Sequence, residues 1–391
     1  MIEGILYGVV AGVASGFTPG LHPNDFFSNF APSFPDPSDT VAFTALSEST
    51  NVPLSKLETM FLGIPDDAGS TTVLVPLQAY TAQGRAREGA GLVAIGATAS
   101  TVSSTLLVPA LSPVLSANYH YIAPLIPFAI LSVVSLQARD NGKHGLVTAG
   151  AASLIGYIAL DSNIPVVNPI GSMLTGFFAI GPGVLSVTKR VEIPTQHDVS
   201  PEPDTSDVIK SAILASTTGI LLGFLPGLGP ANVVSIFLRL GMNSAERYVM
   251  ATSGVDSADA ISSVTSLYYM DNPRSGASVY LQRHLGCVTW EQTLEYMGLY
   301  ALGLVLGTRI LTACCSPFGR LVSGARGRVI TASVVVGLTL MTALHGPGSL
   351  GVALAAAAVS IYSETRGVDP SLSMACLAVP TALTLLGDAG T

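Results

Sequence analysis

The chain has 391 residues, of which 49% are hydrophobic and only 11% are charged, with a mean hydropathy of +0.56 and a formal net charge of −8. A soluble domain carries about 25% charged residues, so this composition excludes a soluble globular protein. The acidic balance, which leaves no basic stripe, also excludes nucleic acid as a partner.

Apolar segments long enough to cross a bilayer, which takes about 20 residues, recur along the whole chain. We expect membrane helices at 4–21, 90–115, 119–137, 145–162, 167–188, 211–228, 248–268, 292–313, 329–345, 348–363 and 371–388. Gly and Pro interrupt three more apolar segments, which are predicted to be re-entrant hairpins or half-helices: 22–35, 58–80 and 229–240. These features predict a multi-pass protein of the cell membrane.

One motif occurs twice in the chain. The segment Gly16–Pro23 (GFTPGLHP) matches Gly223–Pro230 (GFLPGLGP) at a spacing of 207 residues. A duplicated motif this far apart indicates two related halves. We therefore divide the chain into a first membrane repeat at 1–190, a polar linker at 191–208 and a second membrane repeat at 209–391.

Positive charges indicate how the two halves are oriented, because loops rich in Lys and Arg stay in the cytoplasm. Arg85 and Arg139 are two predicted crossings apart, and so are Arg320 and Arg366. If all four are cytoplasmic, the loop around Arg274 is external, whereas its first-half counterpart around Arg85 is internal. The predicted fold is an all-α polytopic membrane protein with two inverted repeats of about five transmembrane helices each, plus re-entrant hairpins or broken helices.

The duplicated motif also suggests a binding site. Proline breaks a helix and glycine admits unusual backbone angles, so the two breaks free backbone groups that attract ions. The alternative is a kink needed only for packing. The predicted substrate-binding residues at the breaks are Pro19, Gly20, Asn24 and Asp25 in the first half, and Pro226, Gly227, Gly229 and Asn232 in the second.

Carboxylates inside apolar segments are costly to bury and usually mark ion pathways. Hydroxyl oxygens beside them suit Na⁺, a hard cation. The candidate coupling-ion residues are Asp66, Asp67, Ser70, Thr71, Asp256 and Asp259. The alternative is that these segments lie in water at the membrane edge.

A third candidate element is Arg274-Ser275-Gly276, in which a guanidinium precedes a hydroxyl and a glycine. This arrangement is typical of an anion cradle, although a solvated loop arginine is the alternative. No phosphate-binding loop, catalytic motif or metal-ligand spacing occurs. We therefore expect no enzyme and no cofactor, with Na⁺ or H⁺ as the coupling ion.

Several motifs resemble the large permease subunit of the tripartite tricarboxylate transporters, the TctA family. They are Gly223–Pro230, Gly63–Pro65 followed by Leu77–Tyr80 and Gln83–Ala86, and Pro273–Ser278. The resemblance spans nearly the whole chain. It implies secondary transport of carboxylates, together with a small membrane subunit and an extracytoplasmic binding protein. Asp66-Asp67 and His22 depart from the family pattern and indicate a divergent branch.

The sequence thus favours a secondary-active transporter that moves a di- or tricarboxylate, with Na⁺ or H⁺ as coupling ion and its site between the two breaks. Expected contacts are a small-molecule anion and membrane lipid, and a homo-oligomer is compatible with the sequence. One alternative is a translocase for a lipid-linked phosphate such as polyprenyl phosphate, which re-entrant hairpins also suit. Another is a membrane scaffold that transports nothing.

Overall fold

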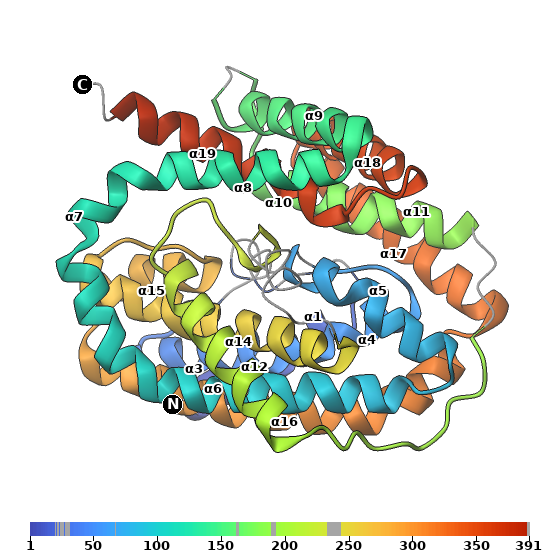
Figure 1. Ribbon diagram of the computed structural model, residues 1–391, viewed down its shortest axis with the longest axis horizontal. Helices are drawn as coiled ribbons and strands as arrows, with labels where there is room; N and C mark the ends of the chain where they lie inside the picture. The colour runs from blue at the N-terminus through green and yellow to red at the C-terminus, as the bar shows by residue number, and fades with distance from the viewer. Residues whose placement is uncertain are drawn as a thin grey trace.

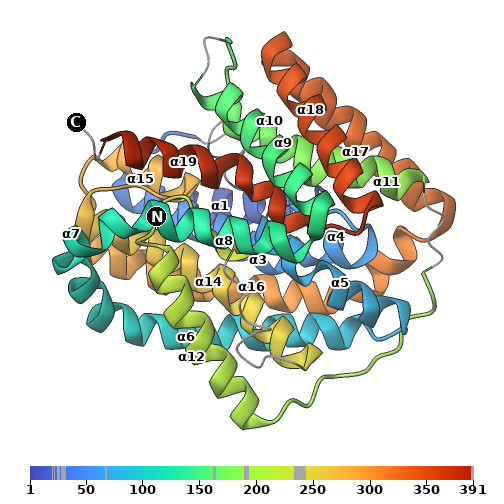
Figure 2. The same ribbon diagram turned by 45° about the horizontal axis from the view of Figure 1, so that its top comes forward.

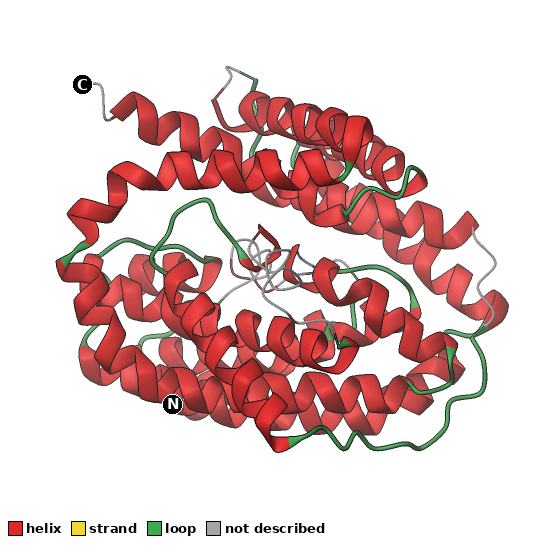
Figure 3. Cartoon of the chain, viewed as in Figure 1, coloured by secondary structure: helices red, strands yellow, loops and turns green. Residues whose placement is uncertain are grey.

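The computed structural model describes residues 1–19, 21, 23, 27, 32–66, 68–161, 164–188, 193–232 and 244–388. These residues form helices joined by turns and loops, and no strand occurs among them (Figure 3). The prediction of an all-helical fold is confirmed for this part of the chain. Each predicted membrane segment coincides with a helix or overlaps one.

The first half contains a run of helices that ends before the polar linker. Its elements are α1 (Ile2–Gly16), α3 (Pro37–Leu54), α4 (Lys56–Phe61), α5 (Ala68–Ala82), α6 (Ala86–Ala117), α7 (Tyr119–Ile122), η1 (Ala123–Leu125), α8 (Ile126–Asp140), α9 (Gly142–Asp161), α10 (Pro169–Leu174), η2 (Thr175–Ile180) and α11 (Gly181–Thr188).

The second half has a similar order. Its elements are α12 (Thr205–Leu222), α14 (Ala245–Met270), α15 (Gly276–Leu285), α16 (Trp290–Leu321), α17 (Gly324–Leu344), α18 (Pro347–Thr365), η3 (Pro370–Met374) and α19 (Ala375–Asp388). Both α6 and α16 have 32 residues, and each follows a short helix, α5 or α15.

Six helical segments of the described residues are long and apolar enough to cross a membrane, three in each half. They are Ala86–Ala117, Tyr119–Asp140 and Pro169–Thr188, followed by Trp290–Leu321, Gly324–Leu344 and Pro370–Gly387. Three of these spans precede the polar linker and three follow it. The chain is a multi-pass membrane protein.

The helices form two layers, each built from both halves (Figure 1). One layer contains α1, α3, α6, α12, α14 and α16, and the other contains α8 to α11 with α17 to α19. In the turned view, α9, α10, α17 and α18 stand clear of α6, α12, α14 and α16 (Figure 2). The polar linker at 193–204 runs outside the first layer, where the His197 amide donates to the Gly84 carbonyl at 2.7 Å.

Packing between the halves is reciprocal. In the first layer, α3 packs on α16, and α14 packs on α6. In the second layer, α9 packs on α19, and α18 packs on η2. Each of these four pairs joins a helix of one half to a helix of the other, and the two halves interlock.

Glycine allows the polar helices α3 and α14 to pack closely against their neighbours. Gly4, Gly8, Gly12 and Gly16 recur every four residues on α1, and a Cβ on any of them would collide with α3. On α12, Gly219 and Gly223 face α14 in the same way. Small residues at such spacing let helix backbones approach closely in a membrane, where burial of apolar area does not drive association.

The crossing of α6 and α14 offers a test of this packing. A Cβ at Gly96 would lie 2.2 Å from the Met250 carbonyl oxygen, so the helices must separate to accept alanine. We expect Gly96→Ala to destabilise the protein by about 1–3 kcal/mol, the usual cost of overpacking. The measurement is thermal unfolding in detergent.

The matched control is Gly298→Ala in α16, where a Cβ would meet nothing within 4 Å. Alanine stabilises a helix interior by about 1 kcal/mol relative to glycine, so this variant should unfold at or above the wild-type temperature. Equal melting temperatures for the two variants would contradict the close packing of α6 on α14.

Candidate functional site

The second break lies between α12 and the other layer. After Leu222 the chain leaves the helix, and Gly227 has φ +75°, a conformation that favours glycine. The Gly229 amide donates to the Asn232 Oδ1 at 3.1 Å, and the Asn232 amide donates to the Gly229 carbonyl at 3.0 Å. Asn232 therefore holds the turn closed and is not simply exposed to a ligand.

Helix α8 holds this turn from the other layer. The Gln137 Nε2 donates to the carbonyl oxygens of Ala231 and Asn232, at 3.3 Å each. Gln137 and Asn232 are both buried. Carbonyl groups that are freed at a broken helix need such hydrogen-bond partners inside a membrane protein. The break is therefore an ordered turn that connects the two layers.

The first break is described only in part. Phe17 ends α1, and its ring lies 6.0 Å from that of Phe318 on α16. Four predicted site residues lie outside the described residues: Gly20, Asn24, Asp25 and Asp67. His22, which replaces Gly229 in the repeat, also lies outside them.

The described part of this segment packs on α15 of the second half. Phe27 stacks on Tyr280 with ring centroids 5.5 Å apart. Burial raises the pKa of Tyr280 to about 12, so its hydroxyl stays protonated and donates to the Pro32 carbonyl at 2.5 Å. The helix that begins after Arg274 therefore supports the chain that follows the first break.

A buried ion pair joins the two halves. The Lys56 Nζ on α4 lies 3.1 Å from Asp256 Oδ2 on α14, and the two side chains are 3% and 9% exposed. Lys56 also donates to the Ser70 hydroxyl at 2.6 Å, and Ser70 donates to Asp66 Oδ1 at 2.5 Å. The structure thus brings three predicted residues, Asp66, Ser70 and Asp256, to one ammonium group.

This cluster lies deep in the protein. Ser100, near the middle of α6, donates to the Gly254 carbonyl at 2.8 Å, two residues before Asp256. Since α6 is one of the segments able to span the membrane, Asp256 lies close to the middle of that span. Thr71 is buried one residue after Ser70, and Asp259 is half-buried on the next turn of α14.

Sequence reasoning missed α3, α4 and the charges that they carry. Glu48 is buried on α3 and accepts a hydrogen bond from the Tyr296 hydroxyl, and Lys56 and Glu58 are buried on α4. A hydropathy search did not single out α3, whose many polar residues are shielded from lipid by other helices. One local signal was available: Asp36 followed by Pro37 is a strong helix start, and the Asp36 side chain does accept from the Ser38 amide.

Arg274 lies at the start of α15, beside the end of α6. Its Nη2 donates to the Tyr119 hydroxyl at 3.2 Å, and its guanidinium lies 6.0 Å from the Tyr119 ring centroid. Its Nε and Nη1 are buried and have no hydrogen-bond partner among the described residues. The amides of Arg274 and Ser275 both donate to the Ser278 hydroxyl, so the guanidinium, and not the backbone, is the group open to an anion.

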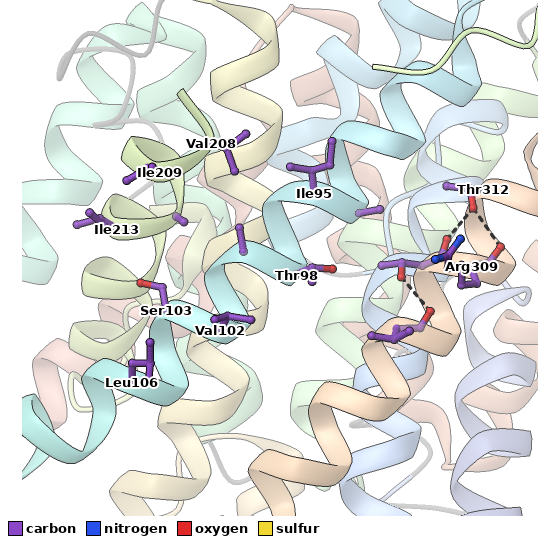
Figure 4. Close-up of a pocket in the computed structure, with 15 residues that line it drawn as sticks. Ile95, Thr98, Val102, Ser103, Leu106, Val208, Ile209, Ile213, Arg309 and Thr312 are labelled. Atoms are coloured by element: carbon purple, nitrogen blue, oxygen red, sulfur yellow. Dashed lines mark hydrogen bonds between the residues drawn. The ribbon is translucent and has the colours of Figure 1, made fainter. Parts of the chain in front are cut away.

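A separate groove of about 770 Å³ lies between α6, α12 and α16 (Figure 4). Its walls carry exposed apolar side chains such as Val102, Leu106 and Ile213, and Arg309 is its one charged residue. Such a lining suits an acyl chain better than a multiply charged carboxylate, because a charge left without partners in apolar surroundings is costly.

The helices, the buried polar interior and the paired charges define a multi-pass helical membrane protein with charges placed inside it, as in transporters. The chain matches the Tripartite tricarboxylate transporter TctA family over residues 3–371. It belongs to this family, which is a family of transporters and not of enzymes. No curated protein and no solved structure matched the chain.

The turn at the second break can be tested by substitution. At Gly227 a Cβ would lie 2.9 Å from Thr381 Cγ2, and φ is +75°. We expect Gly227→Ala to cost at least about 1–2 kcal/mol of stability, the penalty for a left-handed residue with a Cβ. Thermal unfolding in detergent measures it.

Gly229→Ala is the matched control two residues away. Its Cβ would meet only Met374 Cε, at 4.0 Å, and we expect a melting temperature close to that of the wild type. A larger loss at position 229 than at position 227 would show that the turn is built differently.

Proposed function

We propose that this chain is the large membrane subunit of an ion-coupled transporter for a small carboxylate anion of the di- or tricarboxylate class. Family membership supports transport of this class. In the structure, one observation carries the substrate class: Arg274 presents two buried donors, Nε and Nη1, without a partner among the described residues. A guanidinium with free donors fits a carboxylate in a bidentate way.

The substrate path that we propose runs between the two breaks. The substrate-binding residues predicted from the sequence are proposed to line this path. Reciprocal packing of the halves and the three spans in each half support an inverted repeat. Each break is contacted by a helix of the other half. Helix α15 of the second half packs on the chain after the first break, and α8 of the first half bonds to the second break.

Coupling to a cation follows from the membrane potential. Moving one negative charge inward against 100 mV costs about 2.3 kcal/mol, so a trianion needs co-transported cations. The described coupling-ion candidates are Asp66, Ser70, Thr71, Asp256 and Asp259, of which Asp66 and Asp256 share Lys56. We propose Na⁺ or H⁺ as the coupling ion, with no other cofactor.

The family description is that of a tripartite transporter. We propose that the chain works in the cell membrane with a small membrane subunit and an extracytoplasmic binding protein. Homo-oligomers are compatible with this arrangement. A translocase for a lipid-linked phosphate is the second candidate, and the apolar groove beside Arg309 is the observation that favours it.

Reconstitution in proteoliposomes tests the proposal. We expect uptake of labelled citrate or succinate under a Na⁺ or a pH gradient, and a higher melting temperature of the detergent-solubilised protein with added substrate, because a ligand stabilises the state that binds it. Absence of uptake under both gradients together with absence of a melting shift would overturn it. Stabilisation by a polyprenyl phosphate alone would favour the second candidate.

Arg274→Lys tests the substrate site, because lysine keeps the charge but not the guanidinium fork. Hydrogen bonds to a charged group contribute about 1.5–3 kcal/mol, so we expect substrate to bind about 10- to 100-fold more weakly. The dissociation constant can be taken from the melting temperature at increasing citrate concentration.

Arg283→Lys is the matched control, since Arg283 is an exposed arginine on α15, the helix that follows Arg274. This variant should bind citrate as the wild type does. Equal weakening in both variants would indicate a general charge effect and would remove Arg274 from the site.

A further inference from the structure

The Lys56–Asp256 pair is a buried contact between the two halves of the chain. Lys56 begins α4 in the first half, Asp256 lies near the middle of α14 in the second half, and both side chains are at least nine-tenths buried. Asp256 is bonded directly to the ammonium, whereas Asp66 reaches it through the Ser70 hydroxyl. One ammonium group is therefore shared between two carboxylates of different halves.

We propose that Asp256, paired with Lys56, is the residue that takes up and releases the coupling ion, and that this ion is a proton. The inference rests on the proposed transport function and adds to it the identity of the ion and its site. It also assigns Lys56, which no sequence motif singled out, as the fixed counter-charge.

The charges around the pair favour uptake of a further positive charge. Acidic groups come from α3 (Glu48), from α4 (Glu58) and from α14 itself (Asp259), and all three are buried or half-buried. Lys56 is the one cationic residue described in this cluster, so acidic groups outnumber it.

The other described residues that contact this part of α14 are uncharged. Helix α6 contributes Ser100, and α12 contributes Ala215 and Ser216, where α14 passes closest to them at Gly254. Helix α5 contributes Ser70.

Geometry favours a proton over Na⁺. A hard metal cation needs a shell of several oxygen ligands, and at Asp256 Oδ2 the nearest position is already held by the Lys56 ammonium at 3.1 Å. A second cation there would be repelled by that ammonium. A proton needs no shell, because it forms a covalent bond to one carboxylate oxygen.

An independent observation places a partner for that proton beside the carboxylate. The Ser253 hydroxyl is buried, has no hydrogen-bond partner among the described residues and lies three residues before Asp256, on the same face of α14. It can accept a hydrogen bond from a protonated carboxyl group. The ionised carboxylate, which lacks a donor, cannot supply one.

A proton from water on one side of the membrane binds the Asp256 carboxylate, which becomes neutral and loses its ion pair with Lys56. Lys56 keeps its own proton and remains bonded to Ser70, which links it to Asp66. When the proton leaves to the other side, Asp256 becomes an anion again and re-pairs with Lys56.

This step also changes the contact between the halves. Separating an intact buried pair leaves two uncompensated charges and is strongly unfavourable, whereas neutralising one partner removes the Coulomb attraction. Protonation of Asp256 therefore loosens α4 from α14, and loss of the proton restores the contact.

The test uses proteoliposomes that contain a pH-sensitive dye, in Na⁺-free buffer, with the outside more acidic. For the wild type, we expect citrate to be accumulated and the lumen to acidify only when citrate is present. In Asp256→Asn, both signals should fall at least tenfold. Exchange of external labelled for internal unlabelled citrate should remain within about threefold of wild type, because the neutral amide stands for the protonated acid.

Asp207→Asn is the matched control, since Asp207 pairs with Arg247 at 2.8 Å between α12 and α14 but is more exposed. This variant should retain accumulation, acidification and exchange. If Asp256→Asn does not fold, as judged by its melting temperature, the double variant Lys56→Gln with Asp256→Asn replaces it. Removing both charges avoids an unpaired buried ammonium, and the same loss of acidification is expected.

The outcomes separate this inference from the proposed function. Accumulation driven by a Na⁺ gradient without citrate-dependent acidification would overturn the proton site and leave carboxylate transport intact. Wild-type acidification in Asp256→Asn would also overturn it. Absence of uptake, exchange and citrate stabilisation in the wild type would overturn the proposed function itself.

Discussion

The architecture depends on keeping two polar helices, α3 and α14, away from lipid. Nearly every residue of α3 from Asp39 to Leu54 is buried, and α14 buries a comparable set of Ser and Thr side chains. Many of these hydroxyls bond to a carbonyl of their own helix, as Thr44 does to Thr40 and Thr265 to Ile261, which satisfies them without a distant partner. The outer helices α1, α6, α12 and α16 surround the two, and glycines bring α1 and α12 into backbone contact with them.

That shielding explains how charges can exist at this depth. A lysine or aspartate facing lipid would be expelled or neutralised, because a lone ion in an apolar medium is costly. Between α4 and α14 the ammonium of Lys56 instead meets one carboxylate directly and a second through a hydroxyl. Replacing a buried pair by apolar residues is often neutral or stabilising, so such a pair is weak evidence for stability and better evidence for a role in function.

The sequence predicted what faces lipid better than what lies inside. Segments that touch the bilayer, such as those within α6 and α16, must be apolar over about 20 residues, and the length of these apolar runs was sufficient to find them. Helix α3 has no such requirement because other helices cover it, so its polar Ser and Thr run did not predict a membrane helix. The duplicated break was found because proline and glycine are needed there locally. The Lys56–Asp256 pair joins residues about 200 positions apart, and no local pattern encodes that contact.

The interlocked layers restrict how this protein can move. Because α3 packs on α16 and α14 on α6, one sequence half cannot shift as a rigid body against the other without opening both crossings. Movement of one layer relative to the other is less restricted, because turns cross the boundary between the layers. Gly227 lies against Ile130 and Thr381 there, and Gln137 donates to the carbonyls of Ala231 and Asn232. Substrate bound near the breaks would thus meet the place where two rigid groups of helices join. The Lys56–Asp256 pair holds α4 against α14 within one of these groups. It can therefore change how the two groups of helices are positioned relative to each other without contacting the substrate.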